Sequence, residues 1–298
     1  MGKIALSFCT PTLNDSKSVR ETVFHVEQSD LAFPNIYLLR EKYGTTISVH
    51  DGCLYRHFSG TGRLQGYAFP VGHISDLSEA LFHVEQHAQA HGKELKFCLL
   101  TEENARQLQA HYGDKIHFTN DPGDADYLYS RTELAELPGT AFHKKRNHIA
   151  RFEKNFPDWK FEKLAPENSE DALTIATSWA EAQGNSPALL HELRAIKNAL
   201  EHTQELGIIG GLIYCGQRAI AMSLASYITP LVADIHYEKC LPEYRDAYPL
   251  ICREMARILT AELINREEDL NIPGLRQAKL SWKPTRILHK LSAVIKPC

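Results

Sequence analysis

The chain has 298 residues, of which 43% are hydrophobic and 23% charged, and its formal net charge is −4. This is the composition of an ordinary globular protein, and the length suffices for two domains or one large domain. A chain with this net charge is not a generally basic nucleic-acid binder, so any anion-binding surface must be local.

Membrane and secretory segments are not expected. No apolar run approaches the roughly 20 residues that a membrane-spanning helix needs. The apolar part of the N-terminal stretch is too short, and too soon interrupted by polar residues, for a secretory signal. We therefore expect a cytoplasmic protein with no membrane span.

Cysteine and histidine spacing predicts neither disulfides nor a metal site. The seven cysteines are odd in number, scattered and never in a CxxC pair, and the 15 histidines show no HExxH spacing. We expect most of the cysteines to be buried thiols. We expect no metal.

The first part of the chain mixes strand and helix patterns. Short β-branched or aromatic runs that end in Gly or a turn predict strands at 35–44, 45–52, 53–60 and 66–72. Apolar periodicity then predicts helices at 75–92 and 101–113, each followed by a strand, at 95–100 and 115–120. Ser75 or Asp76 can cap the first helix. This pattern favours an α+β or mixed-sheet domain.

A Gly/Pro/Asp-rich stretch at 121–130 reads as a break in the chain. We place the domain junction there, which gives domains 1–125 and 126–298. The second domain is expected to carry the functional cleft.

The second part begins with helices and then turns to strands. Helix patterns cover 130–137, 140–156, 169–184 and 186–207. Runs at 207–214, 219–228 and 231–240 are joined by tight turns, which predicts an antiparallel meander. A helix at 249–263 and a final strand at 276–282 complete the expected order.

Three stretches occur together in this order: "DYLYSRTELAELPGTAFHKKRNHIARFEKNFP", "IHYEKCLPEYRDAYPLICREMA" and "INREEDLNIPGLRQAKLSWKP". They resemble the DUF2156 family, which includes the C-terminal domain of phosphatidylglycerol lysyltransferase and is related to the Fem aminoacyltransferases. The resemblance covers nearly the whole chain. It implies an α+β fold of two tandem GNAT-like domains, with mixed, mainly antiparallel sheets flanked by helices.

The resemblance also implies which segment would meet the donor. In GNAT folds the donor's pyrophosphate sits where the fourth strand turns into a helix, and helix N-termini favour anions. Here that loop is 243–248, which contains no glycine, so close approach of a pyrophosphate to the backbone is harder. A phosphate could still be held by the Arg245 side chain, and a solvated turn with a helix cap is the alternative. The candidate donor-binding residues are Arg245, Tyr248, Lys145, Arg146 and Asn147.

The strand "DIHYEK" leads into this loop and offers candidate proton acceptors. Regular alternation would place His236 and Glu238 on one face, with Tyr237 and Lys239 on the other. Two titratable groups at a strand end could supply a general base near neutral pH. The alternative is a structural pair, in which His236 and Glu238 only satisfy each other's hydrogen-bonding groups. Lys279, expected on the fifth strand of the GNAT-like fold, is the third catalytic candidate.

Three consecutive acids, Glu267, Glu268 and Asp269, precede a segment whose charges are all basic. We expect them to follow a helix end, where their charge opposes the helix dipole. Nearby cationic side chains should then pair with these acids. The resulting ion-pair cluster would support the turn before the last strand. The expected supporting residues are Asn265, Arg266, Glu267, Asp269 and Arg276.

We expect an acyl- or aminoacyltransferase of unknown acceptor, with no tightly bound cofactor. The family resemblance favours aminoacyl-tRNA as donor, and the fold resemblance favours acyl-CoA. A non-catalytic tandem GNAT-like scaffold that binds a ligand or a protein is the alternative from another class. The acceptor could be a small molecule, a lipid or a peptide.

Overall fold

The computed structural model describes residues 6–60 and 63–296. The chain divides into two compact units, and it changes from the first to the second between Asp126 and Tyr127. Two later segments, 268–273 and the stretch from Ile287 onward, return to the first unit. The predicted domains, 1–125 and 126–298, are divided at a single point of the sequence. The first of them therefore leaves out the two later segments that belong to the first unit.

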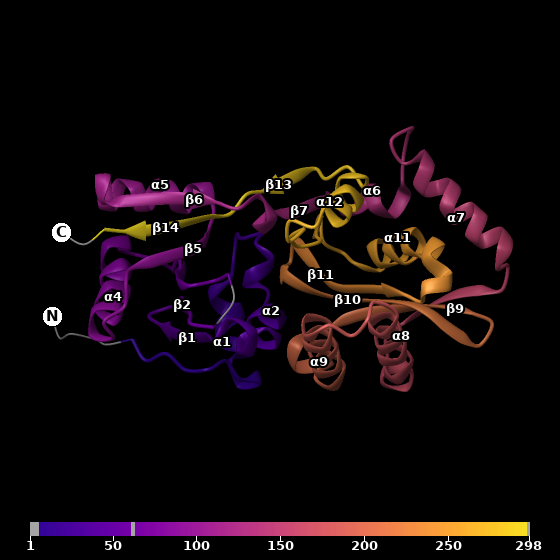
Figure 1. Ribbon diagram of the computed structural model, residues 1–298, viewed down its shortest axis with the longest axis horizontal. Helices are drawn as coiled ribbons and strands as arrows, with labels where there is room; N and C mark the ends of the chain where they lie inside the picture. Colours follow the sequence, from indigo (N-terminus) through magenta and orange to yellow (C-terminus); the bar gives the residue numbers. More distant parts are fainter. Residues whose placement is uncertain (1–5, 61–62, 297–298) are drawn as a thin grey trace. The chain divides into compact units, whose positions relative to one another are not determined.

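The first unit is built on a seven-stranded mixed sheet (Figure 1). The strand order is β1-β2-β3-β5-β14-β6, with β4 paired to β2. Its strands are β1 (Thr45–His50), β2 (Cys53–Phe58), β3 (Gly66–Ala68), β4 (Val71–Gly72), β5 (Lys96–Leu100), β6 (Ile116–Asn120) and β14 (Leu291–Ile295). Its helices are α1 (Ser16–Thr22), α2 (Phe33–Leu38), α3 (Arg40–Tyr43), α4 (Leu77–Ala90) and α5 (Glu102–Tyr112).

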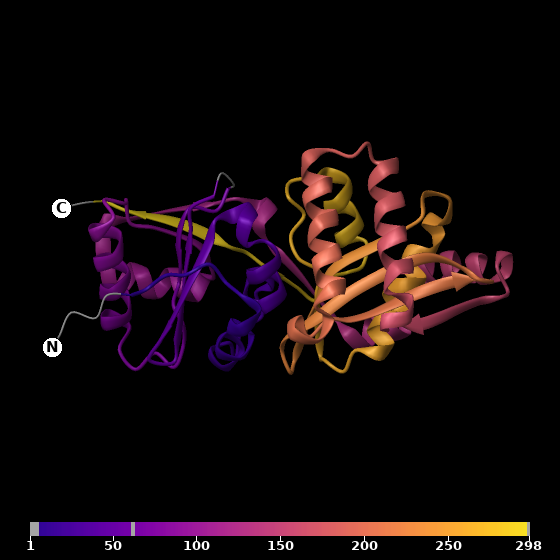
Figure 2. The same ribbon diagram turned by 90° about the horizontal axis from the view of Figure 1, so that it is seen from below.

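The C-terminal strand β14 is the non-local element of this sheet. It pairs antiparallel with both β5 and β6, from Leu291 to Ile295 on the β6 side. Figure 2 shows this yellow strand lying among strands from the first part of the chain. The core under the sheet packs α4 and α5 against it, with Leu81, Val84, Phe97 and Leu108 buried.

The second unit also has a seven-stranded sheet, in the order β13-β7-β12-β11-β10-β9-β8. Its strands are β7 (Asp126–Ser130), β8 (Trp159–Lys163), β9 (Ile209–Cys215), β10 (Arg218–Thr229), β11 (Val232–Cys240), β12 (Leu263–Asn265) and β13 (Arg286–Leu288). Its longer helices are α6 (Arg131–Glu136), α7 (His143–Asn155), α8 (Ser169–Ala182), α9 (Pro187–Glu201), α11 (Tyr248–Ile258) and α12 (Pro273–Leu280). A short α10 (Thr203–Leu206) follows α9, and a 3-10 helix η6 (Pro242–Ala247) precedes α11.

Helices cover both faces of the second sheet. Figure 1 shows α11 on one side of β10 and β11, and α8 and α9 on the other. Both α11 and α8 pack on β10 and β11. The predicted antiparallel meander of β9, β10 and β11 is confirmed, and β12 then joins β11 in parallel.

Local capping signals explain the helix starts. Asp76 accepts hydrogen bonds from the N–H groups of Ser78 and Glu79, and Ser186 accepts one from Leu189. Ser130 does the same for Glu133 at the start of α6. Such side-chain caps satisfy N–H groups that the helix itself leaves unpaired.

Three sequence expectations were wrong. The segment 35–44 forms α2 and α3, not a strand, and Pro34 stands in the first turn of α2. The segment 276–282 lies largely in α12, which begins at Pro273 and continues with good helix formers from Leu275 to Leu280. The stretch 121–130 contains the change from the first unit to the second, but its second half is not a loop: it forms β7, whose Tyr127, Leu128 and Tyr129 are buried.

Cysteines in the described part of the chain are free thiols. Cys53, Cys98, Cys240 and Cys252 are buried, whereas Cys9 is exposed. Cys298 lies outside the described residues. No helix among the described residues is long and apolar enough to cross a membrane.

Two histidines in the first unit couple its stability to pH. Burial, followed by the charge of Lys93, lowers the pKa of His57 to about 4, and burial lowers the pKa of His87 to about 4. His57 is 4% exposed and its Nε2 lies 3.0 Å from Lys93 Nζ, while His87 Nδ1 lies 2.6 Å from the Tyr67 hydroxyl. Both imidazoles are therefore held neutral in the folded state.

Stability should consequently fall as the pH drops from about 6.5 towards 4, where the unfolded chain binds more protons than the folded chain. Between pH 7 and pH 5 we expect a loss of about 1–2 kcal/mol from His57 in urea unfolding. His57→Gln, which can still accept from Lys93, should flatten this dependence. His117→Gln, at an exposed position of β6, should leave it as in the parent chain. An unchanged pH dependence in His57→Gln would contradict this assignment.

Candidate functional site

The second sheet changes its pairing where β11 meets β12. The two strands pair in parallel only from Val232–Leu263 to Asp234–Asn265. Beyond that point β12 has ended, while β11 continues to Cys240. We call this point the strand split.

A β-bulge at the strand split decides which side chains share a face. On β10, Leu224 pairs with Tyr237 and Ala225 with Ile235, so His236 is the extra residue of β11. Ser226 therefore pairs with Asp234, and Ser223 with Glu238. Because Ser223 and Ser226 are three apart on a strand, Asp234 and Glu238 point to opposite faces.

The prediction that His236 and Glu238 share one face is therefore wrong. His236 Nε2 lies 2.8 Å from Ser226 Oγ, on the face of Asp234. On the same face Lys239 reaches Glu192 of α9, at 2.5 Å. Glu238 alone of the two lies on the α11 face. Regular alternation could not show this, because one extra residue reverses every following side chain.

On the α11 face, Glu238 forms a buried ion pair with Arg266. Arg266 Nη2 lies 2.8 Å from Glu238 Oε1, and the two side chains are 15% and 10% exposed. Burial disfavours the charge of Arg266, but the carboxylate of Glu238 outweighs it, so the pKa of Arg266 is raised. Arg266 therefore stays charged at neutral pH, in a place with little water.

Polar atoms beside this pair are buried and face no partner within the described residues. They are Nη1 of Arg266 and Oγ of Ser223, the residue opposite Glu238. A buried donor without a partner costs free energy in the folded state. These two groups therefore keep an unused capacity to donate a hydrogen bond.

Aromatic rings and a lysine complete the surroundings of Arg266. The guanidinium carbon lies 5.4 Å from the ring centre of Trp282 and 5.9 Å from that of Tyr129. Lys145 Nζ lies 4.1 Å from the ring centre of Trp282 and donates to Ser281 Oγ at 2.8 Å. Burial, followed by the charge of Arg266, lowers the pKa of Lys145. We refer to Glu238, Arg266, Ser223, Trp282 and Lys145 together as the Arg266 site.

The charges of Arg266 and Glu238 act on the thiol of Cys252, which lies on α11. Burial raises the pKa of its thiol to about 12. The thiol therefore stays protonated at neutral pH and is a poor nucleophile. Covalent transfer through Cys252 is not supported.

Lys279, the third catalytic candidate, is buried on α12 rather than on a strand. Its Nζ donates to the backbone carbonyl of Arg266, and its own carbonyl accepts from the Tyr129 hydroxyl at 2.9 Å. Lys279 thus holds the backbone of Arg266 in place. Its geometry favours positioning of the Arg266 site over chemistry.

The residues expected to bind the donor are spread over α7, η6 and α11. Arg146 donates to the carbonyls of Leu137 and Gly139, and so holds the loop between α6 and α7. Asn147 is exposed on α7, and Arg245 is exposed on η6. Of the candidate donor-binding residues on α7, Lys145 is the one that reaches the Arg266 site.

Tyr248 begins α11 directly after η6. Its backbone N–H donates to the carbonyl of Arg245, and Ala247 is already helical. Burial, followed by the charges of Cys240 and Glu238, raises the pKa of the Tyr248 phenol, which stays neutral. The start of α11 is therefore preceded by helix rather than by an open glycine loop.

The three consecutive acids follow strand β12, not a helix end, and each has a different partner. Glu267 faces His236, and Glu268 lies 2.5 Å from Arg63 in the first unit. Asp269 accepts from the N–H of Asn271 at 2.8 Å. The acids therefore do not follow a helix end, and their grouping with Arg266 and Arg276 in one ion-pair cluster stays a prediction.

Asn265 and Arg276 have different surroundings. Asn265 is fully buried, and its Oδ1 accepts from the Glu267 N–H at 2.7 Å. Arg276 lies half-buried on α12. Three further residues that the sequence reading passed over are Ser223, Ser226 and Asp234. The alternating Asp and His of "DIHYEK" was the available signal for Asp234, whereas no local pattern marks the two serines.

The two sheets, each flanked by helices, are a tandem GNAT-like fold, as found in FemX, whose structure matches with a TM-score of 0.61 at 12% identity over 97% of each chain. The family model described as phosphatidylglycerol lysyltransferase, C-terminal, matches residues 22–293. The chain belongs to this family, and the expected resemblance to DUF2156 is confirmed.

Further similarities agree in fold. A conserved protein of unknown function from Bacteroides thetaiotaomicron is 31% identical, with a TM-score of 0.92 over 98% of this chain and 100% of that one. The structure of L-PGS from Bacillus licheniformis matches over 100% and 95% at 13% identity, with a TM-score of 0.67. An uncharacterized protein of Mycoplasmoides gallisepticum is 26% identical over 171 residues, which are 55% of this chain and 54% of that protein. The family and the fold support an aminoacyl- or acyltransferase.

Proposed function

We propose that this chain is an aminoacyltransferase that takes an amino acid from aminoacyl-tRNA and transfers it to an amine or hydroxyl acceptor at the Arg266 site. The observation that carries the proposal is the buried Arg266–Glu238 pair with two unsatisfied donors beside it. Family membership supports aminoacyl transfer as the class of reaction.

The buried pair and the two donors beside it support the following chemistry. The acceptor's nitrogen or oxygen attacks the ester carbonyl carbon of the aminoacyl group. Arg266 Nη1 and Ser223 Oγ donate to the oxygen that becomes negative, which preferentially stabilises the transition state. Glu238 takes the acceptor's proton and passes it to the ribose oxygen as the ester C–O bond breaks. The products are an aminoacylated acceptor and uncharged tRNA.

Acyl-CoA is the less favoured donor. The segment 242–247 holds no glycine and forms a 3-10 helix that leads into α11. Asp246 in this segment is tied to Arg151 at 2.6 Å, which adds a carboxylate where a pyrophosphate would need cations. A helix start without an open glycine loop is a poorer cradle for a pyrophosphate.

The proposal is tested with tRNA charged with a mixture of labelled amino acids, incubated with the protein and a cell-derived small-molecule and lipid fraction. Label should leave the tRNA and appear in one acceptor class only when protein is present. Label that stays on tRNA throughout, together with acetyl transfer from labelled acetyl-CoA in the parallel reaction, would contradict it.

Donor binding should depend on salt, because tRNA phosphates release counterions when cations bind them. We propose that the exposed Arg245 contacts one such phosphate, so Arg245→Ala should reduce the slope of log K against log salt by about 0.7–0.9. Arg106→Ala removes an exposed arginine of α5 in the first unit and serves as the matched control. Equal slopes for both variants and the parent chain would remove Arg245 from the donor surface.

A further inference from the structure

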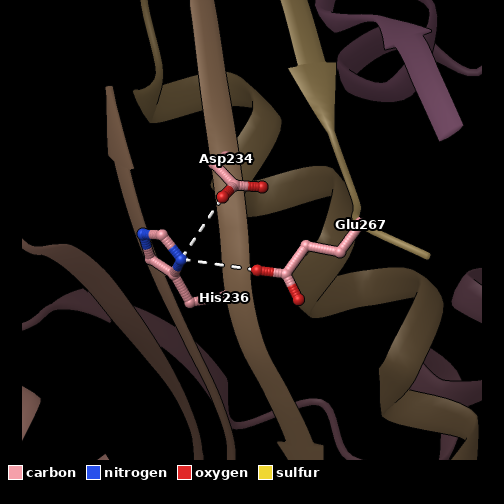
Figure 3. A group of neighbouring side chains, drawn as sticks. All are labelled: Asp234, His236 and Glu267. Carbon is pink, nitrogen blue, oxygen red and sulfur yellow. Dashed lines mark ion pairs between the residues drawn. The ribbon is translucent and has the colours of Figure 1, made fainter. Parts of the chain in front are cut away.

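On the other face of the strand split, three side chains converge on one point (Figure 3). His236 Nδ1 lies 3.4 Å from Asp234 Oδ2 and 3.6 Å from Glu267 Oε1. The donor atoms of all three lie within 4.8 Å of one another. We propose that Asp234, His236 and Glu267 bind a divalent transition-metal ion, with Zn²⁺ as the preferred ion.

The distances fit ligands around a metal better than direct hydrogen bonds. Nitrogen–oxygen hydrogen bonds cluster at about 2.7–3.2 Å, so both separations from Nδ1 are long. Metal bonds of about 2.0–2.2 Å at tetrahedral angles separate neighbouring ligand atoms by roughly 3.3–3.6 Å. The two separations from Nδ1, 3.4 Å and 3.6 Å, fall in this range.

The imidazole of His236 is oriented by Ser226, which contacts the ring nitrogen that faces away from the two carboxylates. Its Nε2 lies 2.8 Å from Ser226 Oγ, so an N–H at Nε2 can donate to the hydroxyl while the Nδ1 lone pair faces the two carboxylates. Metal-binding histidines commonly donate their second nitrogen to such a partner. Ser226 is buried, which fixes the ring.

Burial and residue type also suit a bound cation. The side chains of Asp234 and His236 are 0% exposed, and that of Glu267 is 28% exposed. Carboxylate oxygens and an imidazole nitrogen are ligands that Zn²⁺ takes in proteins. The partly exposed Glu267 provides a route for the ion from solvent.

Backbone geometry brings the three ligands together from two strands. The bulge turns His236 to the face of Asp234, as described above. Glu267 follows β12 with φ 56°, a left-handed conformation that is uncommon for a residue with a side chain, and its N–H donates to Asn265 Oδ1. Asn265 in turn pairs with Asp234. The turn therefore directs Glu267 at His236 and leaves the preceding Arg266 on the α11 face.

This inference is independent of the transfer reaction, but it has a consequence for the Arg266 site. A metal bound to Glu267 would restrain the neighbouring residue, Arg266, at the backbone. Asp234, His236 and Glu267 would then act as positioning residues, with three protein ligands and a fourth position open to water. The expected preference is Zn²⁺ over Mg²⁺ and Ca²⁺, because an imidazole nitrogen is among the ligands.

The test is a titration of the full chain, first freed of metal with a chelator, with ZnCl₂ in competition with a chromophoric chelator. One ion per chain should bind, and Co²⁺ should give the visible spectrum of a four-coordinate site. Asp234→Asn, His236→Gln and Glu267→Gln should each weaken Zn²⁺ binding by more than about 100-fold. If Asp234→Asn and His236→Gln do not fold, Glu267→Gln alone tests the site, because Glu267 is the partly exposed ligand.

Asp246→Asn provides the matched control, because Asp246 Oδ1 lies 3.2 Å from His148 in an exposed pair. It should bind Zn²⁺ as the parent chain does. Binding of less than one ion per chain, or binding unchanged in Glu267→Gln, would overturn the metal site. Neither result depends on transfer activity, so the metal site and the proposed reaction can fail separately.

Discussion

Arg266→Gln is expected to abolish aminoacyl transfer and to destabilise the second unit. Loss of a donor to the developing oxyanion typically lowers the rate by about 10²–10³-fold. Removing one partner of a buried ion pair costs about 3–5 kcal/mol, because the carboxylate of Glu238 is left buried without its cation. Transfer rates and denaturant unfolding of the same preparation measure both effects.

The double variant Arg266→Gln with Glu238→Gln separates the two effects. Two neutral amides replace the buried pair, so most of the lost free energy of unfolding should return. Transfer should remain abolished, because both the oxyanion donor and the proton acceptor are gone. A double variant that transfers at the parent rate would show that the Arg266 site is only structural.

Lys290→Met should lower the free energy of unfolding by about 3–5 kcal/mol. Lys290 is 3% exposed in the side chain, with Nζ at 2.7 Å from Asp126 Oδ1 and 3.2 Å from Asp30 Oδ1. Burial acts to lower the pKa of Lys290, but the two carboxylates outweigh it and raise the pKa. The substitution leaves two buried carboxylates with less positive charge, although Arg56 still pairs with Asp30 at 2.8 Å.

Urea unfolding of the full chain measures this effect, with two comparisons. Adding Asp126→Asn to Lys290→Met should restore part of the loss, because one buried charge is removed with its partner. Lys17→Met removes an exposed lysine, 88% accessible and 3.9 Å from Glu21, and should change stability by less than about 0.5 kcal/mol. If Lys290→Met is as stable as Lys17→Met, the buried network does not hold the C-terminal segment in the first unit.

Local signals in the sequence were sufficient for much of the fold. The caps at Asp76 and Ser186 lie directly before their apolar stripes, so α4 and α9 could be predicted from neighbouring residues. The strand β7 was missed because the turn residues 121–124 precede it without a gap. The return of β14 to the first sheet depends on pairing with residues more than 170 positions earlier, which no local pattern encodes.

The site was harder to predict than the fold. Glu238 and Arg266 were both singled out, but in different roles, and nothing in the sequence paired them across 28 positions. His236 was assigned to the face of Glu238 by regular alternation, and the bulge placed it on the other face. Serines 223 and 226 gain their importance only from the register of β10 against β11.

The most direct test of aminoacyl transfer at the Arg266 site is a pair of binding titrations on the purified chain, one with aminoacyl-tRNA and one with acetyl-CoA. The proposal predicts saturable binding of charged tRNA that is tighter than that of uncharged tRNA, because the aminoacyl ester carbonyl reaches Arg266. This preference for the charged form should disappear in the Arg266→Gln, Glu238→Gln double variant, while acetyl-CoA should not compete. Tight acetyl-CoA binding with no preference for charged tRNA would contradict the proposal.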